Sequence, residues 1–179
     1  RRHTRLLTVT GVQTCALPIC PIGPISTYGA TKYMTEQFLE KLYQKHSDLN
    51  ITILRYFNPI GEHPSGLLKD TGEDNLYPNI RKCIANNTAL SVYGNDYPTP
   101  DGTCIRDYIN IEKLIEYHAL FIKKQGFDIF NVGTGIGKSV LEIIAEFPDL
   151  KYNIEPRRSG DVSSLVCSIS KLQEYQWSI

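Results

Sequence analysis

The chain has 179 residues, which is enough for one ordinary domain with a hydrophobic core or for one piece of a larger protein. Lysines and arginines together number 19, as do aspartates and glutamates, and the resulting net charge of zero argues against a nucleic-acid or anionic-membrane partner. The sequence contains no apolar run long enough to cross a bilayer.

The first twenty residues, RRHTRLLTVTGVQTCALPIC, do not read as part of the same natural sequence as the rest of the chain. They show neither helical nor strand periodicity for long, and they lack the compact apolar core and the cleavage site of a signal peptide. The run VTGVQTCALPI resembles a translated sequencing-adapter remnant. We therefore interpret residues 1–20 as a non-native segment and expect a fragment whose natural beginning lies upstream; a native N-terminal arm is the alternative.

A helix followed by a strand comes next in the chain. After a loop rich in Pro and Gly, apolar residues recur at helical spacing between residues 28 and 46. Residues 51–56, ITILRY, are rich in β-branched side chains and predict a strand. A helix that leads into a strand is half of a β-α-β unit, so this order predicts a parallel sheet. The polar loop that follows, residues 62–75, is long enough to suggest a functional role.

Shorter helices and strands alternate through the remaining residues. Turn-forming residues crowd the segment 94–102, GNDYPTPDG, and residues 154–161 predict a basic turn. Ser168 is placed to cap the last helix. The predicted helices cover residues 76–86, 111–124, 139–147 and 168–175, and the predicted strands cover residues 90–93, 104–109 and 127–132.

Tyr28 and Lys32 are spaced to share one face of the first helix, one turn apart. A lysine ammonium held beside a phenol favours the phenolate, and a tyrosine in that state can act as a general base on a sugar hydroxyl near neutral pH. The same spacing also arises by chance in many helices, so its meaning depends on the motifs that follow it.

The glycine-rich run from Gly133 to Ser139 suggests a nucleotide-binding loop but fits neither standard motif. Three residues separate Gly133 from Gly137 where a P-loop has four, and the run also departs from the dinucleotide-binding fingerprint. We interpret it as a tight strand-to-helix turn with Ser139 as the helix cap.

Arg106 and Arg158 are candidates for binding an anionic ligand. Each lies in an extended or turn-rich segment, and the planar guanidinium can bind a phosphate through two hydrogen bonds. Because Asp107 and Asp161 lie close by in the sequence, surface ion pairs are the alternative that composition alone favours.

Neither the cysteines nor the histidines are spaced for a metal site. We therefore expect reduced thiols in a cytoplasmic protein and no bound metal. The cysteines are residues 15, 20, 83, 104 and 167, and the histidines are residues 3, 46, 63 and 118.

From residue 24 onward the sequence resembles UDP-glucose 4-epimerases, which belong to the extended short-chain dehydrogenase/reductase family. Two runs carry most of the resemblance: residues 54–66, LRYFNPIGEHPSG, and residues 93–109, YGNDYPTPDGTCIRDYI. Nucleotide-sugar dehydratases resemble the first run and depart from the second. Four shorter runs follow the order of the family: YGATK at 28–32, NLYP at 75–78, NVGTG at 131–135 and RRSGD at 157–161.

The resemblance implies a cofactor site for NAD. Tyr28 would be the base on the sugar 4-hydroxyl, and Lys32 would hold the nicotinamide ribose and favour the phenolate. Tyr56 and Phe57 would line the nicotinamide pocket.

The resemblance also implies a UDP-sugar site. Arg106 and Arg158 would clamp the pyrophosphate, Asp161 would lie near the uridine ribose, and the backbone of residues 91–93 would face the uracil. The residues assigned to this site are Asn58, Asn75, Leu76, Ser91, Val92, Tyr93, Arg106, Arg158 and Asp161.

The implied fold is α/β, the C-terminal part of a doubly wound NAD-binding Rossmann-type sheet plus a small α/β substrate domain, truncated at both ends. Residues 21–60 and 110–135 would belong to the NAD-binding domain, and residues 61–109 and 136–179 to an incomplete UDP-sugar domain.

The implied activity is the NAD-dependent interconversion of UDP-glucose and UDP-galactose through a 4-keto sugar, by a parent enzyme that is a homodimer. The glycine-rich first turn, the catalytic serine or threonine and the last helices of the family are missing from this sequence, so we expect the fragment itself to be inactive. A nucleotide-sugar 4,6-dehydratase and a non-enzymatic UDP-sugar-binding protein stay open as alternatives.

Overall fold

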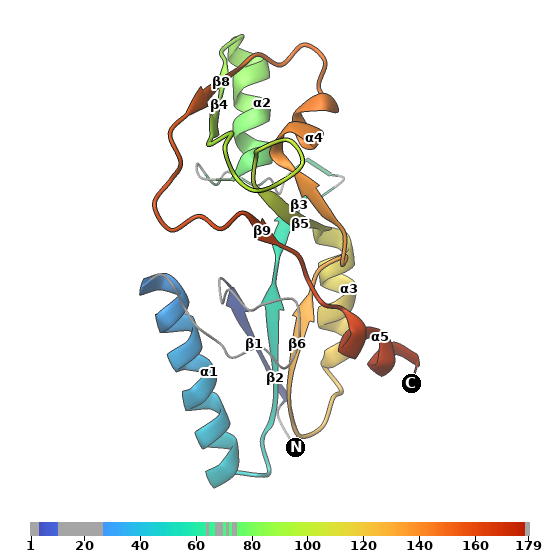
Figure 1. Ribbon diagram of the computed structural model, residues 1–179. Coiled ribbons are helices and arrows are strands. Elements are labelled where there is room, and N and C mark those ends of the chain that lie inside the picture. Colours follow the sequence, from blue (N-terminus) through green and yellow to red (C-terminus); the bar gives the residue numbers. More distant parts are fainter. Residues whose placement is uncertain are drawn as a thin grey trace. The chain divides into compact units, whose positions relative to one another are not determined.

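The structure is a computed structural model that describes residues 4–10, 27–63, 65–66, 70, 72 and 75–177 (Figure 1). The chain divides into two compact units, each described by itself below. Unit 1 comprises Arg1–Pro59, Asp107–Ile136 and Val166–Ile179, and unit 2 comprises Ile60–Arg106 and Gly137–Leu165.

Unit 1 contains a three-stranded parallel sheet in the order β1 (Thr4–Thr10), β2 (Asn50–Tyr56), β6 (Phe127–Val132). The register of β2 against β6 runs from Ile51 opposite Phe127 to Tyr56 opposite Val132. The predicted parallel sheet and α/β fold are thereby confirmed.

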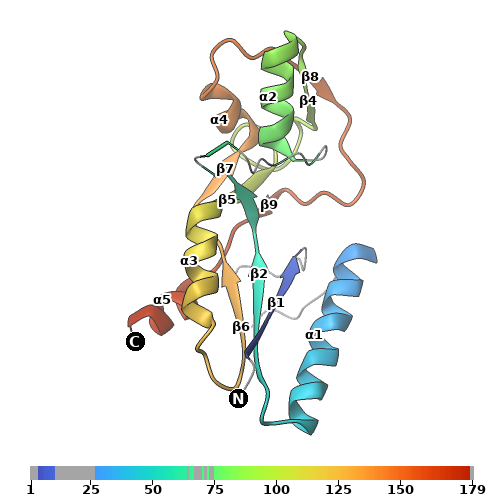
Figure 2. The ribbon, with the colours of Figure 1, turned by 180° about the vertical axis from the view of Figure 1, so that it is seen from behind.

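The two faces of this sheet bury alternate residues of the strands, as the two-residue period of a strand requires. On one face, Ile51 and Ile53 pack with Leu39 of α1 (Thr27–Lys45). On the other face, Leu54 and Phe130 pack with α3 (Ile111–Phe121) and α5 (Ser170–Trp177). Figures 1 and 2 show α1 on one side of the strands, and α3 with α5 on the other.

Unit 2 is built around a parallel pair of strands, β4 (Leu90–Tyr93) and β8 (Tyr152–Glu155). The helix α2 (Leu76–Asn86) precedes β4 and ends where Asn87 adopts a left-handed conformation that asparagine tolerates. The short helix α4 (Val140–Ala145) follows β7 (Gly137–Ser139).

Two further strands connect the units along the chain. β3 (Asn58–Ile60) and β5 (Ile105–Asn110) each cross the boundary between unit 1 and unit 2. In unit 2 the first residues of β5 pair in parallel with β9 (Ser164–Leu165). The sheet order is β3-β5-β7, with β9 beside β5.

Most of the long elements lie where the sequence predicts them, and α2, β4 and β6 have the predicted bounds. Ser139 accepts a hydrogen bond from Glu142 N and the Glu142 side chain accepts one from Ser139 N, so the predicted cap is confirmed as a full capping box.

One strand was not expected and three local predictions were wrong. Thr4–Thr10 forms a strand although its sequence shows little periodicity, since pairing with β2 supplies the hydrogen bonds. The last helix begins at Ser170, so Ser168 does not cap it. Residues 152–155 form a strand where a turn was expected from residue 154, because they pair with β4. α3 ends at Phe121, three residues early. The non-native origin of residues 1–20 stays a prediction.

The unit boundaries also differ from the expected domain boundaries at the C-terminal end. Residues 166–179 belong to unit 1, whereas the expected substrate domain runs to residue 179. The physical reason is that Leu172 of α5 is buried in the core of unit 1 with Phe121 and Phe130. The binding roles of the two units stay predictions.

Candidate active site

The first two turns of α1 carry Tyr28 and Lys32. The Lys32 ammonium nitrogen lies 5.2 Å from the centroid of the Tyr28 ring, and Tyr28 is 52% exposed. Thr31 reinforces this turn by donating from its hydroxyl to the Tyr28 carbonyl at 2.8 Å. The helical spacing thus places a cation on the face of an accessible phenol.

A buried ion pair holds α1 against the sheet. Arg55 donates from Nε and Nη2 to the two carboxylate oxygens of Glu36, at 2.8 Å and 2.6 Å. Glu36 lies two turns after Tyr28 and is 3% exposed. Sequence reasoning missed this pair, because no spacing rule connects a helix residue with a strand residue nineteen positions later.

Two predicted cofactor residues lie at the carboxyl end of the parallel sheet. Tyr56 is the last residue of β2, and the next residue, Phe57, is buried and donates from its backbone N to the Val132 carbonyl at 3.2 Å. Asn58 then begins β3. Ligands of open α/β sheets bind outside the carboxyl ends of the strands, so the fold puts these residues where a cofactor would be held.

Tyr56 is also bonded to a histidine that sequence reasoning treated only as one of four scattered histidines. The Tyr56 hydroxyl lies within hydrogen-bonding distance of His118 Nε2, and His118 Nδ1 lies 2.8 Å from the Leu114 carbonyl. A carbonyl can only accept, so Nδ1 carries a proton, and in the neutral form of the ring Nε2 is then the acceptor for the Tyr56 hydroxyl. His118 therefore orients the phenol of Tyr56.

The glycine-rich run after β6 wraps a carboxylate of the chain itself. Asp107, which is fully buried, accepts from Thr134 N and Gly135 N, each at 2.8 Å, and from Cys167 N at 3.1 Å. A Cβ on Gly133 would lie 2.7 Å from Asp107 Oδ2, so only glycine fits there. These contacts agree with a structural turn at residues 133–136, whereas Gly137–Ser139, expected to be part of the turn, form strand β7.

In unit 2, Arg106 and Asp161 form an ion pair. Arg106 Nη2 lies 3.4 Å from Asp161 Oδ1, and Nη1 donates to the carbonyls of Ile105 and Val162, each at 2.9 Å. Of the two aspartates considered as ion-pair partners from the sequence, Asp161 is thus paired with Arg106, while Asp107 is committed to the glycine turn.

Arg158 contacts another predicted site residue, Tyr93. Its guanidinium carbon lies 3.8 Å from the centroid of the Tyr93 ring, a cation–π contact. Tyr93 and Ser91 are exposed along β4, whereas Leu90 and Val92 are buried. Unit 2 therefore groups four predicted residues in two contacts, Arg106 with Asp161 and Arg158 with Tyr93.

Asn75 and Leu76 lie at the start of α2. Asn75 occupies the N-cap position without a side-chain cap bond; its Nδ2 instead donates to Asp70 Oδ2 at 3.0 Å. Leu76 is the first residue of the helix.

Two negative findings apply to the part of the chain that the structure describes. No cluster of three or more His, Cys, Asp and Glu side chains there is arranged to hold a metal ion. Among the same residues no helix combines the length and the hydrophobicity that a membrane span requires.

Comparisons with known sequences all point to the same protein family. The family model described as "NAD dependent epimerase/dehydratase family" matches residues 9–133. A UDP-glucose 4-epimerase from Yersinia pestis is 42% identical over 171 residues, which cover 86% of this chain and 50% of that protein. One from Yersinia enterocolitica is 46% identical over 155 residues, which cover 79% of this chain and 45% of the relative. The chain therefore spans about half the length of the curated relatives it matches.

Solved structures of UDP-glucose 4-epimerases also match nearly all of this chain and somewhat more than half of their own length. A crystal structure of UDP-glucose-4-epimerase from Stenotrophomonas maltophila with bound NAD and formylated UDP-arabinopyranose superposes with a TM-score of 0.85 at 33% identity, covering 95% of this chain and 57% of that one. A UDP-glucose 4-epimerase from Bifidobacterium longum in complex with NAD+ and UDP also gives a TM-score of 0.85, at 31% identity, covering 96% and 57%.

Proposed function

Because the chain belongs to the NAD-dependent epimerase/dehydratase family, we propose that the protein of which it forms a part interconverts UDP-glucose and UDP-galactose with NAD as cofactor. The observation that carries the proposal is the Lys32 ammonium on the face of the exposed Tyr28 ring. The similarity to epimerases solved with NAD, with UDP and with a UDP-sugar supports the choice of ligands.

The residues of unit 1 fit a nicotinamide cofactor. Tyr56 and Phe57 follow directly on the carboxyl end of β2, and Lys32 offers an ammonium suited to the hydroxyls of a ribose. When bound, NAD supplies a site that takes up a hydride from a sugar carbon and returns it. Tyr56 is oriented for that pocket by its hydrogen bond to His118.

Tyr28 is the proposed general base and acid. Its phenolate removes the proton from the sugar 4-hydroxyl as C4 is oxidised to a ketone, and its phenol returns a proton when C4 is reduced on the opposite face. The Lys32 ammonium, 5.2 Å from the centroid of the Tyr28 ring, is the nearest described cation contact of this phenol.

The residues of unit 2 are the proposed anchor for the UDP part of the substrate. Arg106 and Arg158 bind the pyrophosphate and Asp161 lies at the uridine ribose, while Asn75 and Leu76 contact the sugar diphosphate. Asn58, which belongs to unit 1, is assigned the same role as Asn75 and Leu76. The backbone of β4 from Ser91 to Tyr93 faces the uracil; of these side chains Ser91 and Tyr93 are exposed and Val92 is buried. A firm hold on the diphosphate with a loose hold on the sugar allows the 4-keto sugar to turn over between the two hydride transfers.

The test is a turnover assay on the full-length enzyme that contains this sequence, with UDP-galactose as substrate and UDP-glucose as the measured product. Tyr28→Phe should lose at least about a hundredfold in kcat, the usual contribution of a general base, while UDP still binds. Unchanged turnover would remove Tyr28 from the mechanism.

The same assay separates the two alternatives. A nucleotide-sugar 4,6-dehydratase would release a 4-keto-6-deoxy sugar in place of UDP-glucose. A binding protein without activity would bind UDP and give neither product.

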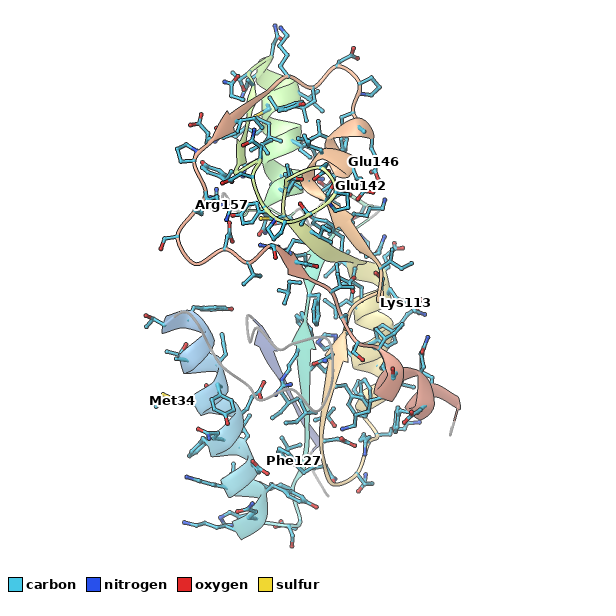
Figure 3. The ribbon with its side chains drawn as sticks, viewed as in Figure 1. Met34, Lys113, Phe127, Glu142, Glu146 and Arg157 are labelled. Carbon is cyan, nitrogen blue, oxygen red and sulfur yellow. The ribbon has the colours of Figure 1, made fainter. Side chains whose placement is uncertain are left out.

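We also propose that the parent enzyme is a cytoplasmic homodimer that pairs through α1, and that the present chain is inactive alone. Met34 and Phe38, one turn apart on α1, are 66% and 63% exposed, an apolar pair that a second copy could cover. Figure 3 shows Met34 pointing away from the sheet. The described cysteines, Cys83, Cys104 and Cys167, are all free thiols, which suits a reducing compartment.

A further inference from the structure

Arg157 makes three contacts with two consecutive residues of the loop after β4. Its Nε donates to Asp96 Oδ1 at 2.6 Å, and its Nη2 donates to the Asp96 carbonyl. The guanidinium carbon lies 4.1 Å from the centroid of the Tyr97 ring. Figure 3 shows Arg157 on the segment that follows β8.

The loop after β4 leaves room for the Arg157 side chain to reach Tyr97. Tyr97 is 5% exposed and donates from its backbone N to the Gly102 carbonyl at 2.9 Å, which closes the loop. A Cβ on Gly94 would lie 2.6 Å from the Tyr97 ring and 2.8 Å from Arg157 Cγ. Gly94, which has φ +84°, therefore leaves the space in which the arginine stem and the tyrosine ring meet.

Arg157 is followed directly by Arg158, whose guanidinium lies on Tyr93. Two consecutive arginines are thus each seated on a tyrosine, one from the last residue of β4 and one from the loop after it. Gly94 N also donates to the Glu155 carbonyl at 2.8 Å, so the backbone entering the segment is bonded to the same loop. The segment has little freedom to swing away from β4 while Arg157 is in place.

We propose that Arg157 is a positioning residue for the UDP-sugar site: it latches the segment that carries Arg158 and Asp161 onto the end of β4. This inference rests on the proposed function, because it assumes that Arg158 binds the pyrophosphate. The guanidinium of Arg157 is committed to Asp96 and Tyr97, so the role assigned to it needs no contact with the substrate. Its effect is to hold Arg158 in a binding geometry before the ligand arrives, which lowers the entropy lost on binding.

The chemistry of the latch requires arginine. The planar guanidinium reaches a carboxylate and a carbonyl from two nitrogens while its face lies on an aromatic ring. A lysine has one compact ammonium and cannot make all three contacts at once. Arg157→Lys therefore keeps the charge and removes the latch.

The test uses the full-length enzyme and isothermal titration with UDP. Arg157→Lys and Arg157→Ala should each bind UDP about fivefold to tenfold more weakly, with NAD affinity and kcat unchanged and KM for the UDP-sugar raised. Lys138→Ala is the matched control, since it removes another exposed ion pair of unit 2, to Glu146 at 2.6 Å, without touching the latch. It should leave UDP binding as it is.

A double-mutant cycle tests whether Arg157 affects UDP binding through Arg158. If Arg157 acts through Arg158, the double variant Arg157→Ala, Arg158→Ala binds UDP no more weakly than Arg158→Ala alone. Losses that add, or an Arg157→Lys variant that binds UDP normally, overturn the inference while the proposed function stands. A failure of the unsubstituted enzyme to bind UDP overturns both. If Arg157→Ala does not fold, UDP binding by Arg157→Lys and Asp96→Asn tests the inference instead, since both variants keep a side chain of similar size.

Discussion

Glu36 of α1 and Arg55 of β2 join a helix to a strand through two hydrogen-bonded contacts, at 2.8 Å and 2.6 Å, with side chains only 3% and 12% exposed. Burying two charges costs desolvation energy, so the main consequence of such a pair is that neither partner can be removed alone. The pair fixes α1, and with it the turn that carries Tyr28, on the strand that ends at Tyr56.

Removal of one partner of this pair should strongly destabilise the protein. Glu36→Ala leaves the Arg55 guanidinium buried without its carboxylate, and we expect the free energy of unfolding in urea to fall by about 3–5 kcal/mol. Lys113→Ala, which removes an exposed pair with Glu116 on α3, should cost less than about 0.5 kcal/mol. Equal losses in the two variants would show that burial of the Glu36–Arg55 pair has no energetic effect.

Two glycines with nearly the same backbone conformation should respond differently to alanine. Gly102 and Gly160 have φ +79° and +84°, so both substitutions carry the left-handed penalty of about 1–2 kcal/mol. A Cβ on Gly102 would also lie 2.1 Å from the Asn95 carbonyl oxygen, whereas nothing lies within 4 Å of one on Gly160. Urea unfolding should show Gly102→Ala to be the more damaging by at least about 1–2 kcal/mol, and equal effects would refute the close contact.

Cys167 should resist alkylation in the folded protein. Its burial, together with the nearby negative charge of Asp107, raises the pKa of the Cys167 thiol well above its ordinary value, and the thiolate is the reactive form. Cys83 is only partly buried. Mass spectrometry after a timed treatment with iodoacetamide at pH 8 should find Cys83 modified at least about a hundred times faster than Cys167. In urea the two rates should converge, and rapid native labelling of Cys167 would contradict its placement.

The stability of unit 1 should depend on the ionisation of Asp128. Burial by itself would raise the pKa of this carboxyl, but hydrogen bonds and charge from Lys171 and Lys124 outweigh burial and lower the pKa. A carboxyl whose pKa is lower folded than unfolded stabilises the fold fully above the unfolded pKa of about 3.9, and this stabilisation is lost as the pH falls through the folded pKa.

We therefore expect Asp128→Asn to reduce the free energy of unfolding by about 1 kcal/mol at pH 7, a modest value because Lys171 is 47% exposed. Urea unfolding from pH 7 down to about pH 2 should show the difference between the two proteins shrinking as Asp128 becomes protonated. A difference that does not change with pH would exclude the ion pairs as its source.

His118 should affect cofactor binding through Tyr56. His118→Phe keeps a ring of similar size but cannot accept the hydrogen bond from the Tyr56 hydroxyl. Under the proposed function, we expect titration of the full-length enzyme to give about three- to tenfold weaker NAD binding, the effect of one lost hydrogen bond. UDP binding should not change. His46→Phe, at an exposed position, is the control, and an equal loss there would remove the argument for His118.

The sequence by itself determined the features that depend on neighbours along the chain. Patterns of apolar and β-branched residues located α1, α2, β2 and β6, a four-residue spacing brought Lys32 onto Tyr28, and Ser139 with Glu142 specified a capping box. These patterns are local, since a helix turn or a strand repeat constrains residues only a few positions apart.

Only the tertiary structure decided which distant residues meet. Arg106 pairs with Asp161 across 55 positions, and the Asp107 carboxylate binds Cys167 N across 60. Arg157 donates a hydrogen bond to Asp96 across 61 positions. Residues Thr4–Thr10 form β1 because their backbone pairs with that of β2. The order in which strands enter a sheet sets such contacts. No spacing in the sequence encodes them, because the chain that separates the partners can fold back by many routes of similar local energy.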